Sequence, residues 1–402
     1  MKYVVILGDG MGGRPLEALG GKTTLEYAAT PTMDSLAGKG ELGLVCNVPQ
    51  GMSPGSDVAN LSVMGYDPAA YYTGRSPLEA LSLRIDMAPT DIVFRCNIVN
   101  VTEDEPYEQK VNTDHSSGEI STAEADQLMD AIRAAFNSDT VQFYTGTSYR
   151  QIMVWKGGSL QELVPAHDHL GQVIAPYLPK NEMLRSMMER SFDILNNHPV
   201  NLARAARGEK KANSLWFWGA GTRPALTSFT EKTGLTGTMI SAVDLLKGIA
   251  VGAGLDAPVI EGATGSLHTN YEGKVQAALD ALLNKGQDFA YIHLEAPDEM
   301  GHQGLMQEKV QAIEYLDSRV VKPVVEALEA AGEDFRLYIV PDHATPLAIR
   351  THNTDPVPYI LYDSRRQARK IARYTEKEAA ATGIFEPNGH NMMSRLLEQE
   401  LC

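Results

Sequence analysis

Residues 2–8 of the chain, KYVVILG, continue after Lys2 as an unbroken apolar run, rich in β-branched side chains, that stops at Asp9. Strands buried on both faces of a parallel sheet have this character, whereas half-exposed antiparallel strands alternate polar and apolar residues. Two later runs, FAYIHL and FRLYIV, are followed in the same way by Asp298 and Asp342. The carboxyl ends of parallel strands gather functional groups at one edge of a sheet. The three runs therefore predict a parallel sheet with carboxylates along one edge.

Helical patterns alternate with such runs near both ends of the chain, which predicts an α/β core with a mainly parallel sheet sandwiched by helices. The middle of the chain differs: residues 91–101, 141–146 and 149–155 have the pattern of strands joined by turns, and 181–207 that of one long helical region. A chain of 402 residues also exceeds the size of a single core. We therefore expect a core divided in sequence, with a smaller α+β domain inserted. The expected parts are 1–88, 89–224 and 225–402.

The composition narrows the range of partners and compartments. A net charge of −16 argues against a nucleic-acid partner and against an anionic membrane surface. No segment approaches the roughly 18 apolar residues of a membrane span. The three cysteines, Cys46, Cys96 and Cys402, are far apart and fit no disulfide framework, so we expect reduced thiols in a cytoplasmic protein. We expect a monomer or a small homo-oligomer.

Asp and His side chains follow several of the expected strands. Asp298 and His302 are four residues apart, so one helical turn would let them bind the same ion. Three Asp and three His are too many ligands for one tetrahedral zinc, but they suit two divalent cations roughly 4 Å apart. Each residue alone could be a helix cap or part of a turn, whereas the joint set favours a metal site. The six are Asp9, Asp298, His302, Asp342, His343 and His352.

Ser56 is the candidate nucleophile for such a site. It follows Pro54 and Gly55 where a helical pattern begins, and a helix N-terminus offers free N–H groups and a positive dipole to a phosphoryl group. A metal bound to its Oγ would lower the pKa of the hydroxyl. Taken alone, Ser56 could equally be a helix cap. Ser53 and Ser62 are alternatives that the turn places less well.

Together these residues resemble the alkaline-phosphatase superfamily, and in particular the archaeal-type branch of the cofactor-independent phosphoglycerate mutases. The stretches that carry the resemblance span essentially the whole chain and follow the order and spacing of that family. They are MKYVVILGDGMG, TPTMDSLAGKG, PGSDVANLSVMGYDP, YYTGRSPLEA, FRCNIV, WFWGAG and PDEMGHQG. Members closest to this pattern have also been proposed as homoserine kinases.

The resemblance implies interconversion of 3-phosphoglycerate and 2-phosphoglycerate, as in glycolysis and gluconeogenesis, through a phosphoserine at Ser56. It implies no 2,3-bisphosphoglycerate, and an inserted domain that acts as a substrate-binding lid. Two divalent ions are implied, with Mn²⁺ favoured over Mg²⁺, Co²⁺ or Zn²⁺. One ion would be held by Asp298, His302 and His352, and the other by Asp9, Ser56, Asp342 and His343.

A small anionic substrate also requires cations to bind its phosphate and carboxylate. The candidates are Arg75 in TGRSP, Arg150 in SYRQ, Lys211, and Arg223 in AGTRP. For each of them a solvated surface charge is an equally good explanation from the sequence.

Three positions depart from the family pattern and leave the substrate open: Glu119, Gly265 and His268. One alternative is a homoserine-kinase-like phosphotransferase on the same scaffold, although no P-loop motif for ATP is present. Another is a metal-dependent phosphomonoester or phosphonate hydrolase. A non-catalytic binding protein is a further alternative, which the full ligand set beside Ser56 disfavours.

Overall fold

The computed structural model describes residues 1–366 and 372–399, and the chain divides into two compact units. The first unit combines Met1–Tyr72 with Leu226–Cys402, and the second is Thr73–Ala225. Helix α5 (Arg75–Ser82) therefore belongs to the second unit. Cys46 and Cys96 are free thiols, and Cys402 lies outside the described residues.

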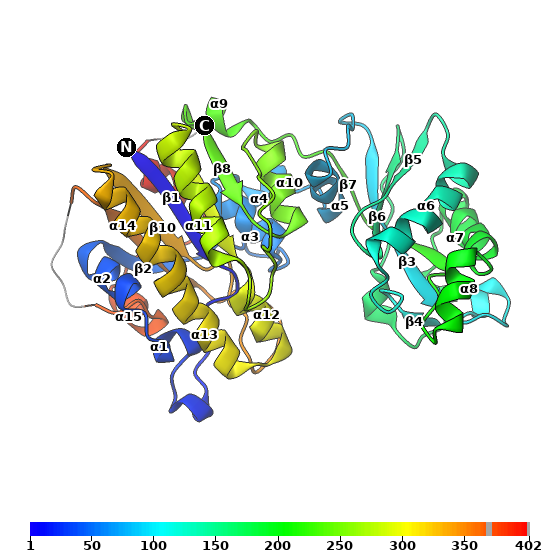
Figure 1. Ribbon diagram of the computed structural model, residues 1–402, viewed down its shortest axis with the longest axis horizontal. Helices are drawn as coiled ribbons and strands as arrows, with labels where there is room; N and C mark the ends of the chain where they lie inside the picture. The colour runs from blue at the N-terminus through cyan, green and yellow to red at the C-terminus, as the bar shows by residue number, and fades with distance from the viewer. Residues whose placement is uncertain (367–371, 400–402) are drawn as a thin grey trace. The chain divides into compact units, whose positions relative to one another are not determined.

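A mainly parallel sheet of seven strands forms the centre of the first unit's described residues (Figure 1). Strand β1 runs parallel to both β9 and β10, and β8 runs parallel to β9. Strand β11 is antiparallel to β10 and β2, so the sheet is mixed on that side. The spatial order is β12 (Phe385–Glu386), β2 (Glu41–Val45), β11 (Val357–Asp363), β10 (Phe335–Val340), β1 (Lys2–Gly8), β9 (Phe289–Leu294) and β8 (Gly237–Ile240).

Helices cover both faces of this sheet, which confirms the predicted core. Val4 and Ile6 of β1 pack in a core with α2, α11, α13 and α14 (Figure 1). On the opposite face, the hydroxyl of Tyr291 donates to Asn60 of α3. The helices are α1 (Thr24–Tyr27), α2 (Pro31–Lys39), α3 (Ser56–Val63), α4 (Pro68–Tyr71), α9 (Phe229–Thr233), α10 (Asp244–Gly252), α11 (Tyr271–Leu279), α12 (Ala296–Gln303), α13 (Met306–Leu316), α14 (Lys322–Ala330), α15 (Glu376–Ala381) and α16 (Asn391–Leu397).

The strand register brings three chain segments level at one edge of the sheet. Leu7 near the end of β1 is paired with Val340 of β10 on one side and with His293 of β9 on the other. Asp9 follows β1 directly, and Asp342 follows β10 after one proline. Helix α12, which starts just after β9, carries the Asp298 segment. Residues more than 280 positions apart in sequence therefore meet at this edge.

The second unit has an antiparallel sheet of its own, with α6 and α7 packed on one face. The core of this unit contains Phe94 and Phe217 from the sheet, together with Leu128 and Leu184 from the helices. Strand β3 is central, because it pairs with β4, β6 and β7. The elements are β3 (Ile92–Val101), β4 (Asn112–Asp114), β5 (Val141–Tyr144), β6 (Arg150–Trp155), β7 (Ser214–Thr222), α5, α6 (Thr122–Phe136), α7 (Glu182–Leu195) and α8 (Pro199–Ala206).

The prediction of one helical region over 181–207 is wrong at its centre. Two helices, α7 and α8, occupy this stretch, and α8 begins at Pro199. Proline disfavours helical backbone in the residue before it, and it has no N–H to donate. His198 accordingly takes an extended conformation, with φ −62° and ψ 142°, and its ring accepts from the N–H of Val200.

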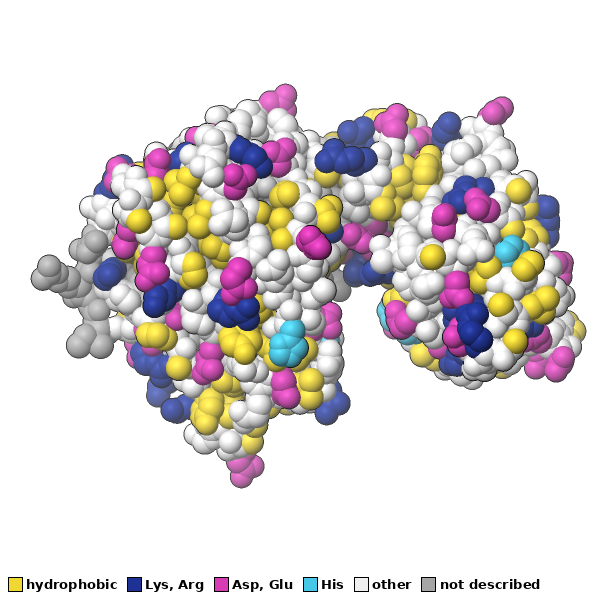
Figure 2. Space-filling view, viewed as in Figure 1, with side chains coloured by type: hydrophobic (Ala, Val, Ile, Leu, Met, Phe, Trp, Pro, Cys, Tyr) yellow, Lys and Arg dark blue, Asp and Glu magenta, His cyan; other side chains and the backbone are white. Residues whose placement is uncertain are grey.

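The surface carries charges of both signs. Figure 2 shows acidic and basic side chains interspersed over the visible face of each unit, without an extended basic area among the described residues there. Within residues 1–366 and 372–399, no helix combines the length and the apolar character needed to cross a membrane.

Because each unit has its own core, a core truncation should act mainly within one unit. Phe94→Ala should destabilise the second unit by about 3–5 kcal/mol, the usual cost of deleting a buried phenyl ring. Hydrogen exchange should then accelerate in β3, β6 and β7 while β1, β9 and β10 stay protected. Leu337→Ala, in the first unit's core, should give the reverse pattern. Equal acceleration in both units would contradict separate cores.

Candidate functional site

Asp9, Asp342 and His343 offer ligand atoms within 4.8 Å of one another at the carboxyl edge of the sheet. His343 Nε2 lies 3.3 Å from Asp342 Oδ2 and 3.6 Å from Asp9 Oδ1. Ser56 Oγ lies 3.2 Å from the same His343 nitrogen. The structure thus brings together all four residues that the resemblance assigns to one ion.

Asp298, His343 and His352 form a second group of converging ligand atoms. His302 completes it, with Nε2 3.1 Å from Asp298 Oδ2 and 2.9 Å from His352 Nε2. The His343 ring stacks on that of His352 at a centroid distance of 3.8 Å. The three residues expected to hold the other ion therefore also lie together, and His343 is within reach of both groups.

The electrostatics of this edge fit divalent cations. Asp9 Oδ1 is buried and accepts no hydrogen bond within the described part of the chain. Burial raises the pKa of Asp9 well above its usual value, and the neighbouring carboxylates of Asp342 and Asp298 raise it further. Crowded buried carboxylates repel one another unless a positive charge lies between them. An ion bound at Asp9 Oδ1 would supply that charge and satisfy the unpaired oxygen.

Neighbouring groups fix the orientation of the ligands. The Asn60 amide donates to Asp342 Oδ2 at 3.1 Å and to the Ser56 carbonyl at 2.9 Å. His302 Nδ1 donates to the Arg350 carbonyl at 2.9 Å, so its Nε2 faces the site. Outer contacts of this kind are typical of metal-binding histidines, because they set the tautomer and the ring orientation. The hydrogen bond with Asp298 also raises the pKa of His302 to about 9.

Ser56 is the first residue of α3, and its Oγ lies 3.2 Å from His343 Nε2. Gly55 holds the N-cap position, with φ −81° and ψ 152°. The helix-cap explanation of Ser56 is therefore not supported, and its hydroxyl faces His343 instead. A hydroxyl at a helix N-terminus, beside carboxylate and imidazole ligands, is well placed to attack a bound phosphoryl group.

Sequence reasoning missed three charged side chains behind Asp9: Lys274, His293 and Glu295. All are at most 3% exposed. Burial lowers the pKa of His293, but Glu295 and Asp9 outweigh that effect and raise it to about 10. The available signal was a histidine within the apolar run FAYIHL, followed two residues later by a glutamate.

Of the expected substrate-binding cations, Arg75 and Arg150 both lie in the second unit, and both affect the pKa of a third arginine that was not predicted. This is Arg95 of β3, which is 5% exposed and lies 5.1 Å from the Trp218 ring. Burial lowers the pKa of Arg95 to about 10; Glu79 opposes this effect, while Arg75 and Arg150 add to it. Glu79 pairs with Arg95 at 3.0 Å and with Arg75 at 3.1 Å.

Lys211 and Arg223 are not brought together. Lys211 precedes β7 and Arg223 follows it, so a nine-residue strand of about 30 Å separates them. Lys211 pairs with Glu103 at 2.7 Å, and Arg223 donates to the Met87 carbonyl at 3.2 Å. One small ligand cannot contact both side chains.

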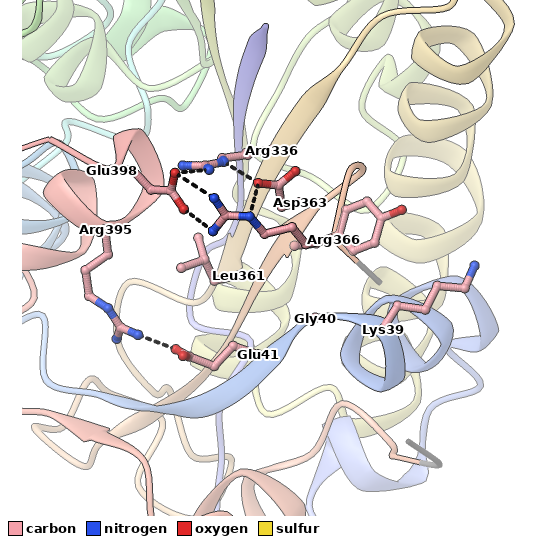
Figure 3. Close-up of a pocket in the computed structure, with 10 residues that line it drawn as sticks. Lys39, Gly40, Glu41, Arg336, Leu361, Asp363, Arg366, Arg395 and Glu398 are labelled. Atoms are coloured by element: carbon pink, nitrogen blue, oxygen red, sulfur yellow. Dashed lines mark hydrogen bonds and ion pairs between the residues drawn. The ribbon is translucent and has the colours of Figure 1, made fainter. Parts of the chain in front are cut away.

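A pocket of 660 Å³ lies at the other end of the first unit's sheet, where β10 and β2 begin. Figure 3 shows Arg336 and Arg366 turned toward Asp363 and Glu398. Arg395 pairs instead with Glu41. These arginines are neutralised by the pocket's own carboxylates, so the metal-ligand edge is the better candidate for chemistry.

Comparisons with known proteins agree on one family. Residues 37–201 match the family model of 2,3-bisphosphoglycerate-independent phosphoglycerate mutase. A protein of Geobacter sulfurreducens named "Probable 2,3-bisphosphoglycerate-independent phosphoglycerate mutase" is 48% identical, over 99% of this chain and 100% of its own. A 2,3-bisphosphoglycerate-independent phosphoglycerate mutase of Methanothrix thermoacetophila is 44% identical, over 99% and 100%. The solved cofactor-independent phosphoglycerate mutase of Thermoplasma acidophilum is 26% identical with a TM-score of 0.67, covering 99% of each chain.

Removal of bound metal should destabilise the first unit. One ion at a hundredfold excess over its Kd contributes about 2.7 kcal/mol, and 1 kcal/mol shifts the Tm of such a domain by about 2–4 °C. We expect the Tm at pH 7 to fall by about 5 °C or more when EDTA replaces Mn²⁺. Differential scanning calorimetry measures the shift, and Asp342→Asn should reduce it. An identical Tm with EDTA and with Mn²⁺ would contradict a metal site.

Proposed function

Because the chain belongs to the family of 2,3-bisphosphoglycerate-independent phosphoglycerate mutases, we propose that it interconverts 3-phosphoglycerate and 2-phosphoglycerate through a phosphoserine at Ser56. Membership of this family makes the chain an enzyme of the isomerase class that works without 2,3-bisphosphoglycerate. The relatives' names do not favour the homoserine-kinase-like, hydrolase or binding-protein alternatives.

One observation carries the proposal: Ser56 Oγ lies 3.2 Å from His343 Nε2, at the start of α3 and among two groups of Asp and His ligands. The N-terminal N–H groups of α3 offer donors to the phosphoryl oxygens. Asn60, four residues on, holds both the Ser56 backbone and Asp342. The nucleophile and a carboxylate ligand are therefore fixed relative to each other by one side chain.

In the proposed reaction Ser56 Oγ attacks the phosphorus of 3-phosphoglycerate. The bond from phosphorus to O3 breaks as the bond to Oγ forms, and the Ser56 proton ends on O3 of the released glycerate. The glycerate then presents O2 to the phosphoserine. The bond to Oγ breaks as the phosphorus–O2 bond forms, and the proton of the O2 hydroxyl returns to Ser56 Oγ. No phosphate is lost, provided that water does not reach the phosphoserine.

The residues present suit two divalent ions, which we propose are held by Asp298, His302 and His352 on one side and by Asp9, Ser56, Asp342 and His343 on the other. When bound, such ions supply positive charge to the transferring phosphoryl group and lower the pKa of the serine hydroxyl. Mixed carboxylate and imidazole ligands accept Mn²⁺, Mg²⁺, Co²⁺ and Zn²⁺. We propose Mn²⁺ as the ion in use.

We further propose that the second unit binds the acidic groups of the substrate through Arg75, Arg95 and Arg150. The support is that Arg75 and Arg95 share the partner Glu79, that Arg75 and Arg150 both lower the pKa of Arg95, and that Arg95 is buried. Buried guanidinium groups bind carboxylate and phosphate strongly, because their donors form paired hydrogen bonds in a site from which water is largely excluded.

The first test of the proposal is Ser56→Ala, which removes only the attacking oxygen. Metal-free protein reconstituted with Mn²⁺ should convert 3-phosphoglycerate to 2-phosphoglycerate without added 2,3-bisphosphoglycerate. Ser56→Ala should lose at least about a thousandfold in kcat, as expected when a nucleophile is deleted. Ser53→Ala, in the loop that precedes α3, should retain activity. A Ser56→Ala rate near that of wild type would rule out the phosphoserine.

Free phosphate, followed in the same tubes, separates the alternatives. Isomerisation with little phosphate release supports the mutase. Dominant phosphate release would identify a hydrolase. Inactivity with Mn²⁺ demonstrably bound would reject phosphoglycerate as the substrate and direct the next assay to homoserine with a phosphoryl donor.

A matched pair of arginine variants tests the substrate-binding proposal. The side chains of Arg75 and Arg185 are similarly exposed, at 42% and 45%, and both lie in the second unit. Arg75→Met should raise KM about tenfold or more, with a smaller change in kcat. This is the loss of binding expected when one hydrogen bond to a charged group is removed. Arg185→Met, which removes the same charge from α7, should leave KM unchanged. Equal KM values for Arg75→Met and wild type would exclude Arg75 from substrate binding.

A further inference from the structure

A buried chain of charged side chains connects helix α11 to Asp9. His293 of β9 places Nε2 2.9 Å from Asp9 Oδ2 and Nδ1 3.0 Å from Glu295 Oε1. Lys274 of α11 donates to Glu295 Oε2 at 2.7 Å. The four residues are between 0 and 4% exposed. Only Asp9 belongs to the proposed ligand sets, so the other three are buried charges that the proposed reaction does not use.

The hydrogen bonds fix each member of this chain. Ionised carboxylate oxygens only accept, so His293 donates from Nε2 to Asp9 and from Nδ1 to Glu295, and Ser241 Oγ lies 3.1 Å from the same Nδ1. Lys274 also donates to the His293 carbonyl at 2.8 Å, which ties the helix to β9. Glu295 Oε1 accepts in addition from Ser241 Oγ at 3.2 Å and from the Ala242 N–H at 2.9 Å. The His293 ring therefore has one orientation in which all of its partners are satisfied.

The two carboxylate oxygens of Asp9 have different surroundings because His293 contacts only one of them. Oδ2 accepts from His293, whereas Oδ1 is buried without a hydrogen bond among the described residues and lies 3.6 Å from His343 Nε2. A carboxylate that could rotate would lose this distinction. Orientation by an outer partner raises the affinity of a metal ligand, because the ligand is ordered before the ion binds.

Resting on the metal sites of the proposed function, we infer that Lys274, Glu295 and His293 are positioning residues that present Asp9 Oδ1 to the ion shared with Asp342 and His343. Asp298, a proposed ligand of the other ion, is held by different contacts. The Asp298 carboxylate accepts from the Thr345 hydroxyl and faces His302, while the Asp298 backbone N–H donates to the Glu295 carbonyl at 3.0 Å, a contact that does not involve the Glu295 side chain. Substitution of Lys274, Glu295 or His293 should therefore weaken the binding of one of the two ions.

The test measures Mn²⁺ affinity directly. Metal-free protein is titrated with Mn²⁺, and free Mn²⁺ is followed by its EPR signal. Wild type should bind two ions. Glu295→Gln changes a side chain whose partners are Ser241, Ala242, Lys274 and His293, none of them a proposed ligand, and it keeps the backbone carbonyl that accepts from Asp298. It should weaken one ion about 10–100-fold and leave the other unchanged. Tyr271→Phe is the matched control, since it removes a buried hydrogen bond to the Leu267 carbonyl from the same helix as Lys274, and it should change neither affinity.

The weakened ion is identified in a His302→Ala background, which disables the Asp298 site. The single remaining ion should be the one that Glu295→Gln weakens. Should Glu295→Gln not fold, His293→Gln carries the test, because its amide keeps one donor near Asp9 while the connection to Glu295 is lost; the same one-sided weakening is expected.

Two results would overturn the inference while leaving the proposed function intact. One is a wild type that binds two ions and a Glu295→Gln variant that binds both with unchanged affinity. The other is equal weakening of both ions, which indicates a general loss of structure. A wild type that binds no ions would instead remove the metal sites on which the proposed function rests.

Discussion

Mutual repulsion among buried carboxylates at one edge of the sheet is the constraint on which the rest of the site depends. Asp9, Asp298 and Asp342 follow three adjacent strands, and parallel pairing brings their segments level. Burial alone disfavours their charged forms, and proximity adds to the penalty. Histidines, donors from the backbone and divalent cations are the groups that offset such a penalty. The arrangement is useful for phosphoryl transfer because the same positive charge that stabilises the carboxylates also stabilises the transferring group.

The two halves of this edge are stabilised in different ways. Asp298 lies among histidines, with His302 and His352 both within 3.4 Å of its oxygens. Asp9 is held instead through His293 by a chain of alternating charges that ends at a lysine. Ser56 lies on the Asp9 side, where Asn60 links its backbone to Asp342. The half supported by this buried chain of charged side chains also holds the proposed nucleophile, whose position is a demanding requirement in an in-line transfer.

Much of the core could be predicted from the sequence, because doubly buried strands are unbroken apolar runs whose ends mark the edge of the sheet. The same logic found Asp9, Asp298 and Asp342, and Gly55 with a following helical pattern indicated the start of α3. The antiparallel direction of β11 was not predictable, because an apolar run does not reveal in which direction its strand crosses the sheet. Lys274 escaped notice because its buried ion-pair partner, Glu295, is 21 residues away in sequence, and His293 because Asp9 is 284 residues away. Only the fold brings these partners close. Arg95 was missed for a similar reason: its partner Glu79 lies on a different element. The break between α7 and α8 could have been predicted from Pro199, because one proline can interrupt a long helical pattern.

The most direct test of the account is a crystal structure of the protein grown with Mn²⁺, with anomalous scattering recorded at the manganese edge. The account predicts two manganese peaks about 4 Å apart, one beside Asp9 Oδ1, Asp342 and His343 and the other beside Asp298, His302 and His352, with Ser56 Oγ next to the first. A single peak, or peaks away from these residues, would contradict it.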